Sequence, residues 1–138
     1  MDIIGRREKI VFTEWGLSSI DAKVDTGAYG SALHSHDIEI CRKEGKDMLR
    51  FKLLDPTHPE YEHKDYYASE FSDKVVKSSS GLQEHRFSVR TEISLAGRIF
   101  RVEFSLTDRS EMRYPVLLGR KFLKKRFLVD VAKKYILK

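Results

Sequence analysis

The sequence contains very little cysteine and no long apolar run, and each shortage excludes a class of protein. Cys41 is the single cysteine among 138 residues, so a disulfide framework and a cysteine-ligated metal cluster are excluded, and a reducing compartment is favoured. No segment approaches the roughly 18 apolar residues that a membrane helix needs, and residues 1–7 lack the apolar core of a signal peptide. We therefore expect a soluble, cytoplasmic chain that does not associate with a membrane.

Two common cofactor motifs are also absent. The sequence has neither a glycine-rich phosphate loop ending in Lys and Ser or Thr nor a His-Glu-x-x-His zinc motif. His34 and His36 would share one face of a strand, and His58, His63 or His85 could add a third metal ligand. Because histidines of this kind are more often simply exposed polar residues, we expect no metal and no cofactor.

The charge balance is moderately basic. Lysine and arginine number 26 against 21 aspartates and glutamates, and the resulting net charge of +5 favours acidic partners. The basic residues are scattered, apart from Lys121, Lys124, Lys125 and Arg126, and no nucleic-acid-binding module is recognisable. An acidic polypeptide and a nucleic acid both fit this charge, a solvated basic face is the ordinary interpretation, and nucleic acid is the weaker candidate.

Period-two alternation of apolar and polar residues predicts a mainly β structure. Short strands are expected at residues 9–12, at 21–24, around Ile38 and Ile40, and at 48–54. Many short strands separated by turn signals favour a barrel or a sandwich. A chain of this length can bury a sufficient core, so we expect a single domain over residues 1–138.

The second half of the sequence adds a hairpin, a long excursion and a short helix. Residues 86–106 form the clearest hairpin, with its turn at Ala96 and Gly97. Residues 55–81 are polar and aromatic, and a segment of this length is expected to be functional, partly structured or mobile, with a flexible tip. A helical turn is expected between residues 119 and 125.

The tripeptide Asp25-Thr26-Gly27 closes one of the predicted strands. Two carboxylates a few ångströms apart cannot both ionise, so one stays protonated and polarises a peptide carbonyl while the other activates water. This chemistry needs a carboxylate with little freedom, a neighbouring hydroxyl and a glycine that permits close approach, and the three residues supply these in order. One tripeptide per chain means that two chains would supply the pair. An ordinary turn is the alternative interpretation.

A second motif, Val116-Leu117-Leu118-Gly119-Arg120, follows about ninety residues later. By itself it predicts a buried strand that ends at a glycine and starts a short helix. Together with Asp-Thr-Gly-Ala, the string Ser31-Ala32-Leu33, the excursion and the hairpin, it resembles the retropepsin family of aspartic proteases over most of the chain. In that family the apolar-Gly-Arg segment packs beneath the catalytic turn.

Further strings are similar to a bacterial retropepsin-like family whose members carry the label ATP-dependent zinc protease. These strings are residues 5–8, 23–28, 31–34, 76–81 and 106–112. Some members are associated with the ATP-grasp ligase that adds glutamates to a ribosomal protein. The resemblance implies a closed, all-β acid-protease fold with one short helix near the C-terminus, an active site at a two-fold dimer interface, and a flap that folds over the substrate.

The resemblance also implies roles for individual residues. Asp25, Thr26 and Gly27 would be catalytic. The substrate-binding residues would come from the catalytic turn, the flap tip and the nearby arginines, namely Ala28, Tyr29, Ser78, Ser79, Ser80, Gly81, Arg109, Arg113 and Arg120. If the three arginines converge near Asp25, the site would favour carboxylate-rich peptides.

The chain departs from the viral retropepsins at Tyr29, where those enzymes commonly carry an acidic residue that pairs with the arginine of the Gly-Arg motif. Arg120 therefore loses its expected partner. A buried guanidinium is rarely left unpaired, so we expect Arg120 to find another carboxylate, such as Asp130 or Glu8, or else to bind an acidic ligand. Serines at the flap tip replace the glycines of viral flaps.

The leading hypothesis is an aspartic endopeptidase that acts as a homodimer on peptides or proteins, with acidic or glutamate-rich polypeptides as candidate substrates. A noncatalytic module of the same fold, which holds an acidic polypeptide or an ATP-grasp glutamate ligase as its partner, is the alternative. A basic barrel that binds nucleic acid is the weakest of the three.

Overall fold

The computed structural model describes residues 1–77, 80–108 and 114–137. Nearly all of its regular structure is β, as the alternating sequence predicts. The elements in chain order are β1 (Asp2–Ile4), β2 (Arg7–Phe12), β3 (Leu17–Val24), β4 (Ser31–Lys43), β5 (Lys46–Leu53), β6 (Tyr66–Ala68), β7 (Phe71–Lys77), β8 (Gln83–Leu95), β9 (Arg98–Thr107), β10 (Val116–Leu118), α1 (Arg120–Leu123) and β11 (Phe127–Val129).

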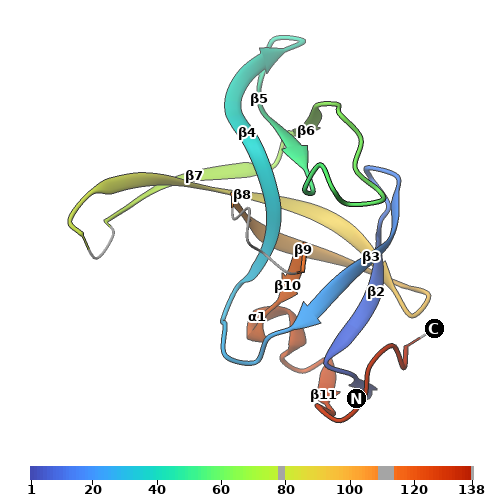
Figure 1. The fold of residues 1–138 in the computed structure, drawn as a ribbon. Helices are drawn as coiled ribbons and strands as arrows, with labels where there is room; N and C mark the ends of the chain where they lie inside the picture. Colours follow the sequence, from blue (N-terminus) through green and yellow to red (C-terminus); the bar gives the residue numbers. More distant parts are fainter. Residues whose placement is uncertain (78–79, 109–113, 138) are drawn as a thin grey trace.

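Six strands close into a barrel (Figure 1). The hydrogen-bonded order runs β10, β3, β2, β8, β9 and β4, and β4 pairs back with β10. Two of these pairings are parallel, β10 with β3 and β4 with β9, and both join segments that are distant in sequence. Phe12, Ile93 and Phe104 are fully buried in the interior. The predicted closed all-β fold with one short helix is confirmed.

The hairpin of β8 and β9 forms as the sequence predicts. Its turn consists of Ala96 and Gly97, which both have positive φ, at 56° and 73°. Positive φ at both central residues is the turn geometry that matches the right-handed twist of paired strands. The strand β8 begins earlier than predicted, at Gln83, because its first part pairs with β7, whereas Ser88 to Leu95 pair with β9.

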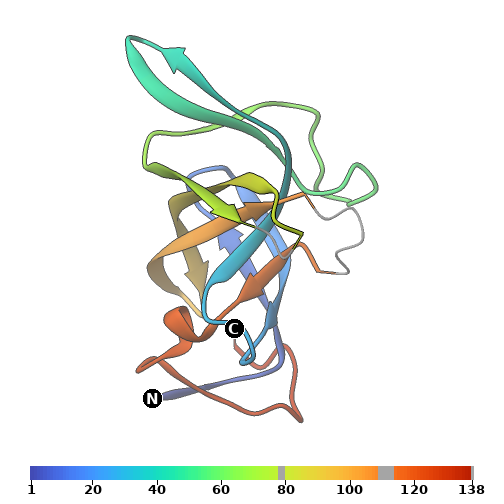
Figure 2. The same cartoon turned by 90° about the vertical axis from the view of Figure 1, so that its left-hand side faces the viewer.

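Two hairpins project from the barrel (Figures 1 and 2). One is the outer part of β4 with β5, and the other is β7 with the first part of β8. β4 belongs to both the barrel and the first hairpin, and it changes direction at a bulge near Asp37, whose φ is 52°. The predicted excursion over residues 55–81 is partly structured, since it contains β6 and β7.

The two ends of the chain meet below the barrel. β1 and β11 pair in parallel as a separate two-stranded sheet. Glu8 is fully buried, and its carboxylate accepts hydrogen bonds from the backbone N–H groups of Gly5 (2.9 Å), Leu137 (3.1 Å) and Ile136 (3.4 Å). The C-terminal segment is thereby tied to the start of the barrel. Over the part of the chain that the structure describes, no helix has the length and apolar character needed to cross a membrane.

Candidate active site

The Asp-Thr-Gly loop, residues 25–30, links the end of β3 to the start of β4. The backbone N–H of Asp25 donates to the Leu118 carbonyl at 2.9 Å, and the N–H of Gly27 donates to Asp25 Oδ1 at 3.0 Å. The Ala28 N–H donates to the Asp25 carbonyl at 3.3 Å. Both the backbone and the side chain of Asp25 are therefore fixed, as the chemistry of a paired carboxylate requires.

Gly119 lies directly against this loop. A Cβ atom on Gly119 would overlap the Gly30 carbonyl oxygen and would stand 2.7 Å from the Tyr29 carbonyl oxygen. Real Cβ atoms are not found so close to backbone atoms, so no side chain fits here without a shift of the loop. The structure thus brings together the two sequence motifs that lie about ninety residues apart.

Two hydrogen bonds join the start of α1 to the same loop, and a third joins it to the first residue of β4. The N–H groups of Arg120 and Lys121 donate to the Ala28 and Tyr29 carbonyls at 2.9 and 2.8 Å. The N–H of Gly119 donates to Ser31 Oγ at 3.0 Å in a buried bond. Ser31 belongs to one of the strings that carry the family resemblance, but that resemblance assigns it no role. Its position at the start of a strand, directly after the loop, was the sequence signal that could have indicated this hydrogen-bonding role.

Arg120 is exposed and does not bind either carboxylate suggested for it. Its Nη1 donates to the Thr26 carbonyl at 3.0 Å, and its guanidinium lies 5.9 Å from the ring centre of Tyr29. Glu8 accepts backbone N–H groups instead, and Asp130 bonds to the Ala132 N–H and lies 3.9 Å from Lys133. Among the described residues, Arg120 has no carboxylate partner. A backbone carbonyl and an aromatic ring satisfy it, and its exposure removes the cost of an unpaired buried charge.

The loop lies at the surface of a single chain. Asp25 is half-buried, Thr26 is exposed, and the side chain of Tyr29 is 62% exposed. Beside the loop is a largely apolar hollow of about 590 Å³, between the loop, α1 and β11. Thr26, Tyr29 and Arg120 form one wall, and Leu123 and Phe127 form another.

The expected substrate-binding residues are only partly brought together. Ala28, Tyr29 and Arg120 lie in or against the loop. Ser80 and Gly81 are exposed at the end of the β7–β8 hairpin, which projects from the barrel (Figure 1). Ser78, Ser79, Arg109 and Arg113 lie outside the described residues, so the expected convergence of arginines near Asp25 stays a prediction.

The histidines considered as metal ligands are spread over several contacts. The rings of His34 and His36 are 6.4 Å apart, and His36 stacks on Tyr61, whose hydroxyl lies 3.1 Å from His63 Nδ1. His85 pairs with Asp73 at 2.8 Å. Within residues 1–77, 80–108 and 114–137, no three His, Cys, Asp or Glu side chains form a group that could hold a metal ion.

A closed β barrel with an Asp-Thr-Gly loop locked against a Leu-Leu-Gly-Arg segment defines the retropepsin-like class. A family model described as RimB-like, retropepsin-like aspartic endopeptidase RimB, matches residues 3–138. The chain belongs to this RimB-like family.

Curated relatives carry a different kind of name. Proteins of Shewanella pealeana and Desulfotalea psychrophila, both named probable alpha-L-glutamate ligase, are 34% and 31% identical over 98% and 94% of this chain. The matched regions are 30% and 28% of those relatives, so the chain spans less than a third of their length.

A solved structure has the same fold. The crystal structure of a Legionella pneumophila protein of unknown function superposes with a TM-score of 0.78 at 28% sequence identity. The match covers 99% of this chain and 98% of that one.

Proposed function

We propose that this chain is an aspartic endopeptidase that acts as a homodimer, with one Asp-Thr-Gly half-site on each subunit. In this mechanism the two Asp25 carboxylates share one proton. The ionised one takes a proton from water, while the protonated one hydrogen-bonds to the carbonyl of the scissile peptide. Water then attacks that carbonyl carbon, and the amine leaves with a proton from the pair.

The observation that carries this proposal is the way the loop is locked. Asp25 is bonded through its own N–H to Leu118 and through Oδ1 to Gly27, and Gly119 fills the space beneath the loop with no room for a side chain. An ordinary surface turn needs no such support. A carboxylate that must meet a second carboxylate at a defined distance does need it, because small displacements change their coupling.

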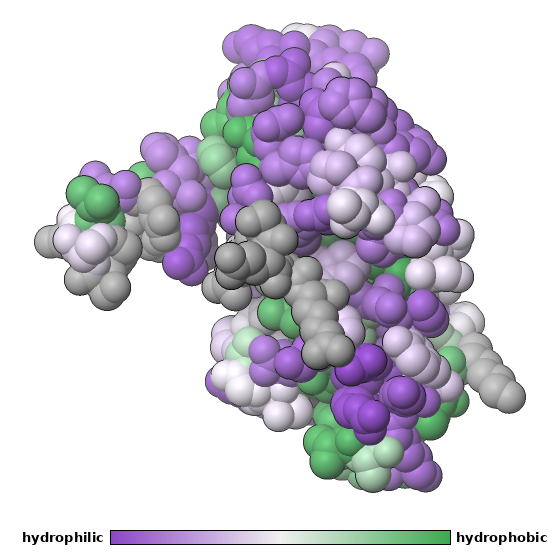
Figure 3. All heavy atoms as spheres, viewed as in Figure 1, coloured by the Kyte–Doolittle hydropathy of each residue, from purple (hydrophilic) through white to green (hydrophobic). Residues whose placement is uncertain are grey.

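The surface beside the loop supports a second copy of the chain as the partner. Exposed apolar side chains gather near β1 and β11, namely Ile3, Leu128 and Val131. Figure 3 shows apolar residues at the lower end of the molecule, in the region where Figure 1 places β11 and the N-terminus. Ile3 lies opposite Leu128 in the β1–β11 pair, so these exposed apolar side chains are neighbours and offer a surface that a second copy could cover.

The test is cleavage of a peptide library, across pH, by the parent protein and by Asp25→Asn. We expect Asn to abolish cleavage, because an amide can neither share the proton nor take one from water. An Asp25→Asn protein that cleaves a confirmed substrate as fast as the parent would refute the mechanism. Analytical sedimentation at the concentration of the activity assay tests the dimer separately. A monomer with full activity would refute an active site shared between two subunits.

A binding module is the second candidate, and the names of the curated relatives favour it. Those proteins are named ligases, and this chain matches less than a third of each. A domain of this fold could hold an acidic polypeptide, or a glutamate ligase, without cutting it. In a crystal of the dimer, two Asp25 side chains facing each other within hydrogen-bonding reach would argue against this candidate, since a binding module has no need to bear that like-charge cost.

We also propose that the substrate is acidic, that residues 1–138 form one domain, and that the protein works in the cytoplasm. The net charge of +5 supports an acidic substrate, and the single cysteine supports a reducing compartment.

A further inference from the structure

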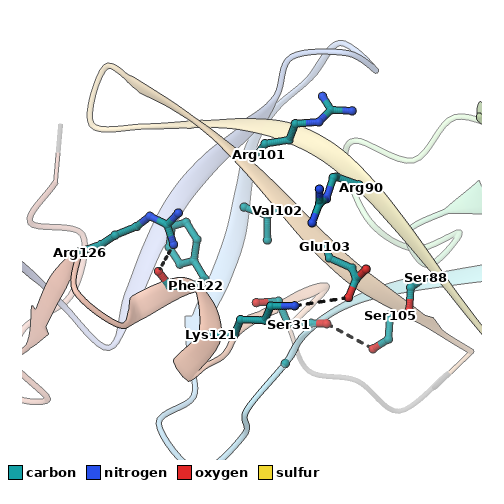
Figure 4. A pocket seen from close by; sticks show the side chains of 11 residues that line it. Ser31, Ser88, Arg90, Arg101, Val102, Glu103, Ser105, Lys121, Phe122 and Arg126 are labelled. Carbon is teal, nitrogen blue, oxygen red and sulfur yellow. Dashed lines mark hydrogen bonds and ion pairs between the residues drawn. The ribbon is translucent and has the colours of Figure 1, made fainter. Parts of the chain in front are cut away.

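We propose that a basic hollow beside the Asp-Thr-Gly loop is an anion subsite, which holds a carboxylate side chain of an acidic polypeptide away from the scissile bond. The inference rests on the proposed function only in taking that polypeptide to be the substrate. The hollow has a volume of about 280 Å³ (Figure 4). Among the residues that line it are Ser31, Ser88, Arg90, Glu103, Lys121 and Arg126.

Five segments of the chain bring these residues together. Ser88 and Arg90 lie on β8 directly opposite Ser105 and Glu103 on β9, so their side chains share one face of the hairpin. Lys121 comes from α1, and Arg126 from the turn that follows it. Gly30 and Ser31, at the end of the Asp-Thr-Gly loop, complete the wall. The hollow is therefore adjacent to the candidate active site.

The charges in the hollow are unevenly paired. Lys121 Nζ lies 3.8 Å from Glu103 Oε1, and Arg101 is occupied by Glu14 at 3.4 Å and Glu70 at 2.6 Å. Figure 4 shows the Arg90 side chain pointing toward Glu103, whereas Arg101 points away. Among the described residues, neither Arg90 nor Arg126 has a carboxylate partner.

The side chain of Arg126 is held in place by contacts that use only part of its N–H donors. Its Nη1 donates to the Phe122 carbonyl at 2.9 Å, and its guanidinium lies 5.5 and 5.8 Å from the ring centres of Phe122 and Phe100. A guanidinium has five N–H donors in a fixed fork, so one bond leaves most of them available. An arginine positioned in this way loses little conformational freedom when it binds a carboxylate.

The surrounding charge reinforces the site. Residues 120–126 contain Arg120, Lys121, Lys124, Lys125 and Arg126 and no acidic residue. Lys124 and Lys125 are exposed, and Lys124 lines the neighbouring hollow beside the loop, so the positive charge of this segment extends beyond the basic hollow.

An acidic polypeptide fits the surroundings better than a nucleic acid does. A second hollow of about 330 Å³ shares Ser88, Arg90 and Glu103 with the first and continues to Phe71 at the base of β7. The two together form a groove between the loop and the projecting hairpin, as an extended peptide would need. Protein grooves that bind single-stranded nucleic acid present exposed aromatic rings on which the bases stack. Here the rings of Phe100 and Phe122 are buried, and the guanidinium of Arg126 already covers them.

The test measures binding to the Asp25→Asn protein, so that the peptide is not consumed. Binding of a labelled peptide of consecutive glutamates is measured by fluorescence anisotropy for four proteins, all of which carry Asp25→Asn. The first has no further change, and the second adds Arg90→Gln. The third adds both Arg90→Gln and Arg126→Gln, and the fourth adds Arg42→Gln and Lys46→Gln. The last pair removes the same charge from the tip of the remote β4–β5 hairpin. We expect the double variant in the hollow to weaken binding about tenfold or more, and the remote pair about twofold or less. A glutamine peptide of the same length should bind the parent weakly.

Equal loss in the two double variants would overturn the subsite, because the effect would then be general attraction. Arg90→Gln alone keeps the test valid if Arg126→Gln fails to fold, since Arg90 is exposed. Full displacement of the peptide by inorganic phosphate at low concentration, or tighter binding of single-stranded RNA that also depends on Arg90 and Arg126, would likewise overturn it. Cleavage of a confirmed substrate by Asp25→Asn would contradict the proposed function without contradicting the subsite, because the subsite test depends only on the relative affinities of the four proteins. In the active protein, the double variant should raise KM for an acidic substrate without lowering kcat.

Discussion

Gly119 and Gly30 contact each other so closely that no side chain can stand between them. A Cβ on Gly119 would overlap the Gly30 carbonyl oxygen, whereas a Cβ on Gly30 would meet nothing within 4 Å. The space is therefore restricted on one side of the contact only. Because Gly30 belongs to the loop that carries Asp25, the geometry of the candidate active site depends on the size of residue 119.

We expect Gly119→Ala to lower the free energy of unfolding by about 3 kcal/mol, because the added methyl group must push the loop backbone aside. Gly30→Ala is the matched control, in the same loop but facing open space, and should cost less than about 1 kcal/mol. Urea denaturation of both variants gives the comparison. Equal free energies of unfolding for the two variants would show that the contact is not restrictive.

Ser31→Ala should destabilise the protein by about 2 kcal/mol, because the buried N–H of Gly119 then loses its acceptor. Ser88→Ala, on the rim of the basic hollow, is a control with the same chemical change and should cost less than about 0.5 kcal/mol. Thermal unfolding of the two variants measures the difference. Exchange of the Gly119 amide with solvent should also speed up in Ser31→Ala, and unchanged exchange would mean that another acceptor replaces Oγ.

Glu8→Gln should lower the free energy of unfolding by about 2 kcal/mol. The Glu8 carboxylate accepts three backbone N–H groups, and an amide would present its NH₂ group to at least one of them. Hydrogen exchange should show faster exchange at Ile136 and Leu137 than in the parent. Glu44→Gln, an exposed glutamate at a turn, is the control and should change neither quantity.

Asp21 makes part of the stability depend on pH. Burial alone would raise the pKa of Asp21, but hydrogen bonds from Lys9 and Tyr135 and the positive charges of Lys9 and Arg7 outweigh it and lower the pKa. A pKa that is lower in the folded chain contributes stability above the unfolded pKa, and the contribution disappears as the pH falls through the folded pKa.

Tyr135→Phe removes one of these hydrogen bonds, which joins the Tyr135 hydroxyl to Asp21 Oδ1 at 2.9 Å. We expect a loss of about 0.5 kcal/mol at neutral pH, and a loss that shrinks once the pH falls below the folded pKa of Asp21. Urea denaturation across an acid-to-neutral pH series checks this. Tyr67→Phe removes a hydroxyl elsewhere and should show no such trend, and a constant loss in Tyr135→Phe would contradict the assignment to Asp21.

The barrel strands could be predicted from local patterns in the sequence, and the partnership of the two motifs could be predicted from the family resemblance. Alternation locates the β8–β9 hairpin, and Ala96-Gly97 marks its turn. The contact of Gly119 with the loop follows from the resemblance. None of these predictions depends on knowing how a distant polar group is satisfied.

The residues that the sequence could not assign act through distant partners. Glu8 was expected only as a possible carboxylate partner for Arg120, yet it is fully buried and accepts backbone N–H groups from Gly5 and from the far end of the chain. Arg120 was expected to pair with another carboxylate or else to bind an acidic ligand. Among the described residues it pairs with no carboxylate, and it lies at the surface against the Thr26 carbonyl and the Tyr29 ring, so binding of an acidic ligand stays a prediction. Among the described residues, Arg90 lacks a carboxylate partner because the neighbouring glutamates pair with Arg101 and Lys121, and the sequence does not indicate which of these pairs form.

The double pairing of β10 has a consequence for how the chain folds. β10 joins β3 and β4, whose residues precede it by more than seventy positions, and it is also the segment that supports Asp25. Contacts between segments so far apart in sequence form slowly, because a long loop must close first. A ribosome must therefore deliver the segment through β10 before the barrel can close, and until then Asp25 lacks the Leu118 carbonyl that holds its backbone. Any activity that depends on an ordered Asp25 would accordingly require this late segment to be in place.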